Sequence, residues 1–555
     1  MEKKQSKGRW RAFAFFPLFL LGRAICGSLT ALRGREAGEL EDEGELDMPY
    51  RREKRKIVTR DGTRLTASVW IPEGTGPFPA VIMVHSWGLW RLQPDLLHAA
   101  SFARRGYVVL TYTCRGWGLF NDQVCVTAPD KELCDLEDAI DWLVDPEMGF
   151  PVDPERIGIT GISYGGGHSF LAATRDPRIK AAAPMNGWTD LYFSLVPNDS
   201  WKAPWTGLLM VLGIWAHRFS PKNILMRWAK ALLIEWNPRK LKEDCDERSA
   251  IHDVGKVKCP MFIVHSWNDD LFEPNQILKF YKELNVPKKL HIANGPHGLD
   301  AGRGDLFVPN KIWDDARRWF DYWLKGDRDN GIDKEPAVTF FQPWNGMMGT
   351  AHHWPPEGIA DVTYFLRGEA AADAGALSPL PPDDGEPLER LVNNTVSNLQ
   401  SSGPPLFRPN VIKNLPIPGV PFTINGDSIA FTSEPFSSET VMVGAPHVNI
   451  HAASSTNECQ LNAMLYDVSP RGFPRLLTHC VMTKNDMVPG EIREFDFELI
   501  ACAHMFKPGH KARLVLCAAD PLYVMPSQVP SQYRIAHTVE HPSSVALPLM
   551  GVAAS

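Results

Sequence analysis

Short apolar runs alternate with amphipathic segments over residues 56–323. The continuous apolar runs predict buried strands at residues 80–85, 107–112, 156–161, 179–184, 259–265 and 289–293. The segments between them, such as 93–105, 131–143, 164–173 and 274–283, have helical character. Asp61-Gly62 joins two further short runs as a hairpin turn would. This alternation predicts a mostly parallel sheet with helices on both faces.

The alternation stops between residues 188 and 254. This stretch is helical in pattern and aromatic, because it contains Trp201, Trp205, Trp215, Trp228 and Trp236. An insertion between the sixth and seventh strands of such a sheet is expected to lie above the strand ends as a cap. The apolar face of residues 208–215 fits core or lid packing, and a membrane-surface patch is the alternative.

The pattern changes again after about residue 333. Short strand-like runs appear at residues 338–341, 441–443, 448–451, 460–466 and 513–516, with Pro- and Gly-rich turns between them. Such runs predict a β-sandwich or jelly roll of about 200 residues. The predicted organisation is therefore an α/β domain at 51–187 and 255–332, a helical cap at 188–254, and a β domain at 333–555.

Residues 1–50 read as a signal-like segment followed by a linker. Five basic residues precede an apolar run at 12–21, as in a signal peptide, and the run is too short to span a bilayer. Residues 36–47 are acidic and contain no aromatic residue, which indicates a linker. We expect a secreted or periplasmic, cell-envelope protein. The alternative is a cytoplasmic protein with a disordered N-terminal extension.

Composition mainly excludes function classes. With 58 Lys and Arg against 65 Asp and Glu, the net charge of −7 provides no basic field for nucleic acid. Ten Cys in 555 residues do not form a disulfide scaffold, and for Cys125 and Cys134 a pair and two free thiols both stay open. The chain contains neither H-E-x-x-H nor a phosphate-binding G-x-x-x-x-G-K-[ST], so we expect no metal and no cofactor. A homo-oligomer is compatible with the sequence.

The segment Gly161-Ile162-Ser163-Tyr164-Gly165 has the G-x-S-x-G pattern of a nucleophile elbow. A predicted strand leads into it and an apolar helical segment leads out of it. Glycines flank the serine because a side chain there would collide with neighbouring backbone. Ser163 is therefore the candidate nucleophile.

A serine hydroxyl needs a base, and the base needs an orienting acid. In this architecture the acid and then the histidine follow the serine along the chain. Asp269 and Asp270 come just after the strand at 259–265. We favour Asp269, with Asp270 as the alternative acid, because Asp270 leads into the next helix. His297 follows the strand at 289–293 and is the candidate base.

The oxyanion that forms during acyl transfer needs fixed hydrogen-bond donors. The backbone N–H of Tyr164, directly after the nucleophile, is one candidate. The loop after the strand at 80–85 offers the backbone N–H of Trp87 as the second. His85 lies where it would shape this loop rather than act as a base.

Several segments together resemble the cocaine esterase and X-Pro dipeptidyl-peptidase family of α/β-hydrolases, the CocE/NonD group. They are residues 59–65, 153–166, 183–191, 506–514 and 542–548, with the acid and histidine loops. The resemblance implies an α/β-hydrolase fold with a helical cap, followed by an all-β jelly-roll (galactose-binding-like) domain. It also implies Ser163 as nucleophile, Asp269 as acid and His297 as base. Two positions depart from the family: Trp87 replaces an oxyanion tyrosine, and Thr113 replaces an aspartate.

These observations predict a serine hydrolase that cleaves carboxylic esters through an acyl-serine intermediate. The alternative is an X-Pro dipeptidyl-peptidase or aminopeptidase-type amide hydrolase acting on short peptides. A peptidase would need acidic groups to hold the substrate amine, and the cap offers Glu235, Asp244, Asp246 and Glu247. A non-catalytic binding protein on the same fold is the second alternative. The aromatic residues of the cap suggest a substrate group with apolar bulk.

Overall fold

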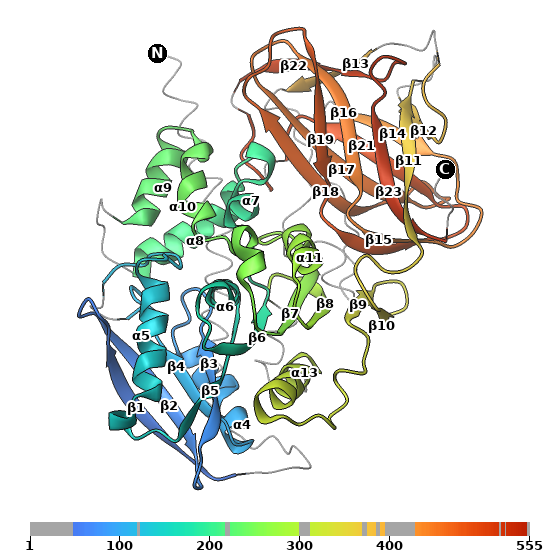
Figure 1. Cartoon of the computed structure of the whole chain (residues 1–555). Helices are drawn as coiled ribbons and strands as arrows, with labels where there is room; N and C mark the ends of the chain where they lie inside the picture. The colour runs from blue at the N-terminus through green and yellow to red at the C-terminus, as the bar shows by residue number, and fades with distance from the viewer. Residues whose placement is uncertain are drawn as a thin grey trace.

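The computed structural model describes residues 48–118, 122–216, 223–298, 311–368, 374–383, 389–394, 428–520, 523–527 and 529–551. The predicted signal-like segment and acidic linker up to residue 47 lie outside the described residues. An α/β domain carries a group of helices at one end, and an all-β domain lies beside both (Figure 1).

The α/β domain is built on a ten-stranded sheet of order β1-β2-β4-β3-β5-β6-β7-β8-β9-β10. From β4 through β3 to β9 all neighbours are parallel, while the pairs β1–β2, β2–β4 and β9–β10 are antiparallel. The strands are β1 (Tyr50–Val58), β2 (Arg64–Pro72), β3 (Phe78–Val84), β4 (Val108–Tyr112), β5 (Val152–Ile162), β6 (Ile179–Met185), β7 (Met261–Asn268), β8 (Lys288–Pro296), β9 (Val338–Gln342) and β10 (Met347–Ala351).

Helices cover both faces of this sheet, as the alternating pattern predicted. One face packs against α5 (Glu132–Val144), α6 (Tyr164–Arg175) and α11 (Pro274–Glu283), and the other against α4 (Ala99–Arg104), α13 (Lys311–Phe320) and the π-helical turn at Asp321–Lys325. The helix predicted at 93–105 is broken into α3 (Leu92–Leu97) and α4. The break falls at His98, whose ring stacks on Trp313 at 3.6 Å between centroids.

The first sheet extends beyond residue 332, where the sequence had suggested that the β domain begins. The run at 338–341 is a strand, but as β9 it pairs with β8 in the α/β sheet. Val338 and Phe340 are buried in the core of that domain. Their burial and the otherwise open edge of β8 explain why the chain joins this sheet first.

The helical cap lies between β6 and β7 in the chain. It contains α7 (Leu191–Leu195), α8 (Ala203–Ala216), α9 (Ile224–Leu233) and α10 (Lys242–Asp246), with 3-10 turns at Pro197–Asp199, Pro238–Leu241 and Ala250–Lys256. Trp201 and Trp228 are buried, whereas Trp236 is 54% exposed. The side chain of Trp215 lies outside the described residues. The tryptophans of the cap are thus not all core residues.

The β domain forms a 13-stranded sheet system whose strand pairs are antiparallel except for β12–β14. Buried side chains such as Phe431, Leu461 and Phe495 form its core. Its strands are β11 (Ile359–Arg367), β12 (Ala374–Ser378), β13 (Glu389–Asn394), β14 (Ser428–Ser433), β15 (Thr440–Gly444), β16 (His447–Ser454), β17 (Cys459–Val468), β18 (Pro474–Lys484), β19 (Ile492–Glu498), β20 (Cys502–Phe506), β21 (Lys511–Cys517), β22 (Ser531–Ala536) and β23 (Ser544–Met550).

The β domain contacts both the cap and the catalytic domain. The backbone N–H of Met525 donates to the carbonyl of Trp201 in the cap at 2.8 Å. Asn275, at the start of α11, donates to the carbonyl of Leu499 at 2.9 Å and accepts from the N–H of Ala501 at 2.8 Å. Within the ranges given above, none of the helices has both the length and the apolar character of a membrane span.

Candidate active site

Ser163 lies at a tight turn between β5 and α6. Its φ of 59° is rare for a residue with a side chain, and its N–H donates to the carbonyl of Met185 at 2.9 Å. A Cβ on Gly161 would lie 2.6 Å from the carbonyl oxygen of Val84, and one on Gly165 would lie closer still. Both glycines are therefore required for the elbow to pass beside β3.

His297 and Asp269 meet Ser163 at the carboxyl edge of the sheet. Ser163 Oγ lies 2.8 Å from His297 Nε2, and His297 Nδ1 lies 2.8 Å from Asp269 Oδ2. Asp269 follows β7 and His297 follows β8, so neighbouring parallel strands deliver both side chains. A carboxylate accepts only, which makes Nδ1–H the donor and leaves Nε2 to accept from the serine.

The carboxylate of Asp269 is fully buried and held on several sides. Its Oδ1 accepts from the backbone N–H of Leu271 at 3.2 Å and of Phe272 at 2.9 Å. Burial alone would raise the pKa of Asp269, but His297 and these donors hold the pKa below its usual value. Asp269 is thus ionised and fixed toward His297. It is this aspartate, rather than Asp270, whose carboxylate meets the imidazole ring.

Two polar residues beside Asp269 were not predicted from the sequence. Asn186 Nδ2 donates to Ser266 Oγ at 3.0 Å and to Asp269 Oδ2 at 3.4 Å. His265 Nε2 donates to the carbonyl of Phe272 at 2.7 Å, and burial lowers the pKa of His265, so the ring is neutral. Asn186 follows directly after the apolar strand β6, which is the same signal that identified Asp269.

The loop after β3 faces the elbow and carries the second predicted oxyanion donor. The indole N–H of Trp87 donates to the carbonyl of Leu209 at 3.1 Å, so its backbone N–H is the simpler donor for an oxyanion. Ser86 Oγ donates to the carbonyl of Ile162 at 3.0 Å and ties this loop to the elbow. The backbone N–H of Tyr164 opens α6, where helical N–H groups have no partner within the helix.

His85 has the loop-shaping place that the sequence suggested. Its Nδ1 donates to the carbonyl of Ser86 at 2.8 Å, and its Nε2 accepts from the N–H of Cys114 at 3.1 Å. Burial lowers the pKa of His85 to about 4, so the ring stays neutral at physiological pH. His85 thus joins the loop after β3 to the loop after β4.

A cavity opens beside Ser163 between the α/β domain and the cap, and with the solvent at its open mouth it holds about 490 Å³ of empty space. The cap contributes aliphatic side chains, among them Leu209 and Met210 of α8, which supports the lid interpretation of residues 208–215. No lining side chain is charged. The lining residues are Trp87, Val126, Ser163, Tyr164, Trp188, Leu191, Leu195, Thr206, Leu209, Met210, Leu225, Trp228 and Phe272.

The four acidic cap residues that could have bound a substrate amine lie outside the cavity. Glu235 pairs with Lys230 and Lys240, and Asp246 pairs with Lys242. Asp244 pairs with Arg227 and Glu247 with Arg248. None of the four is among the residues that line the cavity. They therefore form ion pairs within the cap rather than a binding site next to Ser163.

Cys125 and Cys134 are both free thiols in the structure. Among the residues that the structure describes, no group of three or more His, Cys, Asp or Glu side chains is placed to hold a metal ion.

Comparison with known proteins agrees with this architecture. Residues 61–299 match the family described as X-Pro dipeptidyl-peptidase (S15 family), and residues 330–545 match the X-Pro dipeptidyl-peptidase C-terminal non-catalytic domain. Together the two matches span both domains. The chain belongs to the CocE/NonD family of serine hydrolases. The resemblance predicted from the sequence is therefore confirmed.

Similar CocE/NonD proteins carry both esterase and peptidase names. A putative Xaa-Pro dipeptidyl-peptidase of Bacillus anthracis is 23% identical over 470 residues, covering 76% of this chain and 71% of the relative. The cocaine esterase of Rhodococcus sp. is 21% identical over 580 residues, covering 89% and 97%.

Solved structures support the fold of this CocE/NonD chain. A CocE/NonD family hydrolase from Staphylococcus aureus superposes with a TM-score of 0.68 at 14% identity, covering 93% of this chain and 99% of the other. A selenomethionine-labelled α-amino acid ester hydrolase gives a TM-score of 0.67 at 20% identity, covering 92% and 98%. The fold is thus an α/β-hydrolase domain with a helical cap and a separate all-β domain.

Proposed function

We propose that this hydrolase is a serine esterase that cleaves carboxylic esters with an apolar acyl or alcohol group. The observation that carries the proposal is the linked set Ser163–His297–Asp269 beside an uncharged apolar cavity. Such a cavity stabilises apolar substrate groups by removing them from water.

The proposed reaction begins at Ser163 Oγ, which attacks the ester carbonyl while His297 Nε2 takes its proton. The backbone N–H groups of Tyr164 and Trp87 are the proposed donors to the oxyanion of the tetrahedral intermediate. His297 then protonates the leaving alcohol, and an acyl-Ser163 ester remains. Water activated by His297 attacks this ester, and the acid product leaves with Ser163 restored. Asp269 keeps the proton on Nδ1 and stabilises the imidazolium form of His297.

The chemistry of the cavity favours an ester over a peptide with a free N-terminus. An ammonium group inside a closed site needs a carboxylate partner, because an unpaired buried charge is costly. No carboxylate lines the described cavity. The nearby buried acid Glu273 already holds the ammonium of Lys202, with Nζ to Oε1 at 2.6 Å.

An X-Pro dipeptidyl-peptidase is the second candidate, because both family matches carry that description. The family matches support the peptidase, whereas the uncharged, apolar lining of the cavity supports the esterase.

One panel tests both candidates. Hydrolysis of p-nitrophenyl acetate, butyrate, octanoate and benzoate would be compared with that of Ala-Pro-p-nitroanilide, using wild type and Ser163→Ala. We expect ester turnover to dominate, to favour the apolar acyl groups, and to vanish in Ser163→Ala. Anilide turnover well above ester turnover would establish the peptidase instead. Absence of all turnover, with no labelling of Ser163 by a fluorophosphonate probe, would leave the non-catalytic binding protein.

We also propose that the chain is exported and that its β domain has a jelly-roll arrangement. The basic residues before the apolar run at 12–21 support export. The predominance of antiparallel pairs supports the arrangement of the β domain. Cell fractionation with N-terminal sequencing of the mature protein tests export, and an intact N-terminus on a cytoplasmic protein would contradict it.

A further inference from the structure

Glu132 opens helix α5 and lies buried behind the nucleophile elbow. The hydroxyl of Tyr164 donates to Glu132 Oε1 at 2.5 Å, and both side chains are only 1% exposed. The second oxygen of Glu132 is buried, with no hydrogen-bond partner among the described residues. The carboxylate thus accepts from a single side-chain donor, the phenol of Tyr164, which is the residue directly after Ser163.

The ring of Tyr164 has aromatic neighbours on several sides. Trp87 lies edge-on at 5.1 Å between ring centroids, and His168 at 4.6 Å. Trp117 and Trp188 follow at 6.3 Å each. Ring contacts of this kind restrict where the ring of Tyr164 lies, but they are less directional than hydrogen bonds. The bond to Glu132 holds the phenol at the far end of the side chain.

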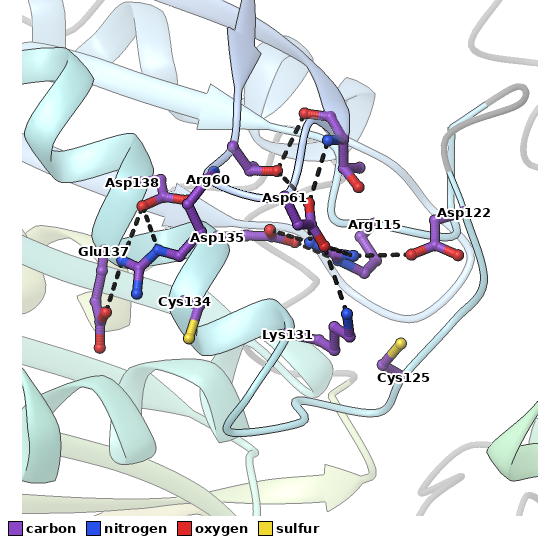
Figure 2. A network of polar contacts seen from close by, with 12 residues as sticks. Arg60, Asp61, Arg115, Asp122, Cys125, Lys131, Cys134, Asp135, Glu137 and Asp138 are labelled. Atoms are coloured by element: carbon purple, nitrogen blue, oxygen red, sulfur yellow. Dashed lines mark hydrogen bonds and ion pairs between the residues drawn. The ribbon is translucent and has the colours of Figure 1, made fainter.

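The first turn of α5 is itself anchored three residues further along the helix, at Asp135. Asp135 binds Arg115 with two parallel bonds, Nε to Oδ2 at 2.8 Å and Nη2 to Oδ1 at 2.5 Å. Figure 2 shows Arg115 at the centre of this network, where Asp61 and Asp122 also reach its guanidinium, each at 2.8 Å. The helix turn that holds Tyr164 is therefore locked to the loop after β4.

That loop contributes to the same wall of the active site. Gly116 has a φ of 81°, and a Cβ there would collide with the backbone of Val124, so the loop folds back on itself directly after Arg115. It then carries Trp117 against Tyr164 and Val126 to the cavity. The network around Arg115 and the bond from Tyr164 thus converge on one side of Ser163.

We propose that Glu132 is a positioning residue for catalysis: its carboxylate anchors the phenol of Tyr164, and through that side chain it fixes the backbone N–H that stabilises the oxyanion. This inference rests on the proposed hydrolase function. Oxyanion donors are effective because they are already in place when charge develops, and small displacements weaken them. A side chain anchored at its far end limits the movement of its own backbone at the start of α6.

Burial raises the pKa of Glu132 to about 7, against the lowering effect of the Tyr164 bond. Both protonation states of the group keep an oxygen that can accept from the phenol. A glutamine keeps such an oxygen too, whereas a leucine does not. Glu132→Gln is therefore the conservative variant and Glu132→Leu the disruptive one.

The test compares kcat and KM of four variants on the best p-nitrophenyl ester, with thermal unfolding measured for each. For Tyr164→Phe we expect kcat to fall about ten-fold, the scale of one hydrogen bond, with KM unchanged within about two-fold. Glu132→Leu is expected to lose at least as much kcat, and Glu132→Gln to stay within about three-fold of wild type. The matched control is Tyr107→Phe, because Tyr107 also donates from a buried phenol to a carboxylate, Asp321, at 2.8 Å. Loss of the Tyr107 hydroxyl is expected to lower the stability of the protein and to leave kcat within about two-fold of the wild-type value.

Three results would overturn the proposal while leaving the esterase intact. They are a wild-type kcat in Tyr164→Phe, an equal loss of kcat in Tyr107→Phe, or a change in KM alone. If Glu132→Leu does not fold, Tyr164→Phe and Glu132→Gln decide the question. Absence of ester turnover and of fluorophosphonate labelling in the wild type would instead remove the proposed function itself.

Discussion

Two buried carboxylates flank the nucleophile, and their proton affinities shift in opposite directions. Asp269 lies on the side of His297 and Glu132 on the side of Tyr164, the proposed oxyanion donor. Burial pushes the pKa of both upward. The pKa of Asp269 nevertheless ends below its usual value, while that of Glu132 rises to about 7.

The difference lies in the partners of each group. Asp269 faces the imidazole of His297 and accepts from two backbone N–H groups, all of which favour the charged form. Glu132 accepts from the phenol of Tyr164, its largest stabilising partner, with smaller contributions from the backbone of Thr127 and the charge of Arg248, while Asp135 nearby adds negative charge. Burial therefore does not decide the charge of a carboxylate in this site, and the donors around it do. The charged carboxylate of Asp269 can stabilise the imidazolium form of His297. Glu132 carries less charge but can still accept a hydrogen bond from the phenol of Tyr164.

The largest expected effect is on the histidine side. Asp269→Asn should lower kcat on the order of 10³–10⁴-fold, because an amide N–H facing His297 Nδ1 favours the wrong tautomer of the ring. Steady-state hydrolysis of the preferred ester measures the loss. The control is Asp270→Asn, for which we expect less than about ten-fold. A greater loss in Asp270→Asn than in Asp269→Asn would reverse the assignment of the acid.

The next effect concerns the anchor of α5. Asp135→Ala leaves the guanidinium of Arg115 buried with a carboxylate missing, and breaking a buried pair in this way costs about 3–5 kcal/mol. Urea unfolding measures the loss of stability. Glu137→Gln on the same helix removes a more exposed contact with Arg60, 2.9 Å long, and should cost below about 1 kcal/mol. Equal losses in both variants would show that Arg115 is held by its other partners.

The opposite pKa shifts also predict opposite dependences of stability on pH. Glu132 binds its proton more tightly in the folded chain, so its stabilising contribution is complete below its unfolded value of 4.5 and disappears as pH rises through about 7. Asp269 contributes above its unfolded value of 3.8, and that contribution is lost as pH falls.

This pH dependence can be isolated with Glu132→Gln, which has no titrating group at that position. The unfolding free energy of wild type, relative to the variant, should fall by about 3 kcal/mol between pH 4.5 and 7. The difference cancels the contributions of buried histidines common to both proteins. A constant difference across this range would mean that Glu132 titrates normally.

The smallest effect is expected for an acid outside the site. Glu235 pairs with Lys230 and Lys240, and these cations lower its pKa. Glu235→Gln should leave kcat/KM within about two-fold for both the ester and Ala-Pro-p-nitroanilide. A selective loss on the anilide would indicate that the cap holds a substrate amine after all.

The sequence predicted Ser163, Asp269 and His297, which the structure brings together, because each follows a strongly apolar strand within a recognisable local pattern. It did not find Asn186 or Glu132, because each acts on a partner far along the chain: Asp269 lies 83 residues from Asn186, and Tyr164 lies 32 residues from Glu132. The helix at 131–143 was predicted, but its apolar spacing says nothing about what its first carboxylate touches. The run at 338–341 was recognised as a strand, and only the edge of β8 decided which sheet it joins.

The meeting point of cap, acid loop and β domain bears on how this chain can be recombined. Lys202 of the cap donates to the carbonyls of Asp270 and Leu271 and to Glu273, which also accepts from the hydroxyl of Tyr523 in the β domain at 2.7 Å. A chimera with a crossover near residue 330 would keep Lys202 and Glu273 but import a foreign residue opposite them. Directed evolution should therefore transfer or redesign three regions together: the cap, the segment after Asp269 and the region around Tyr523.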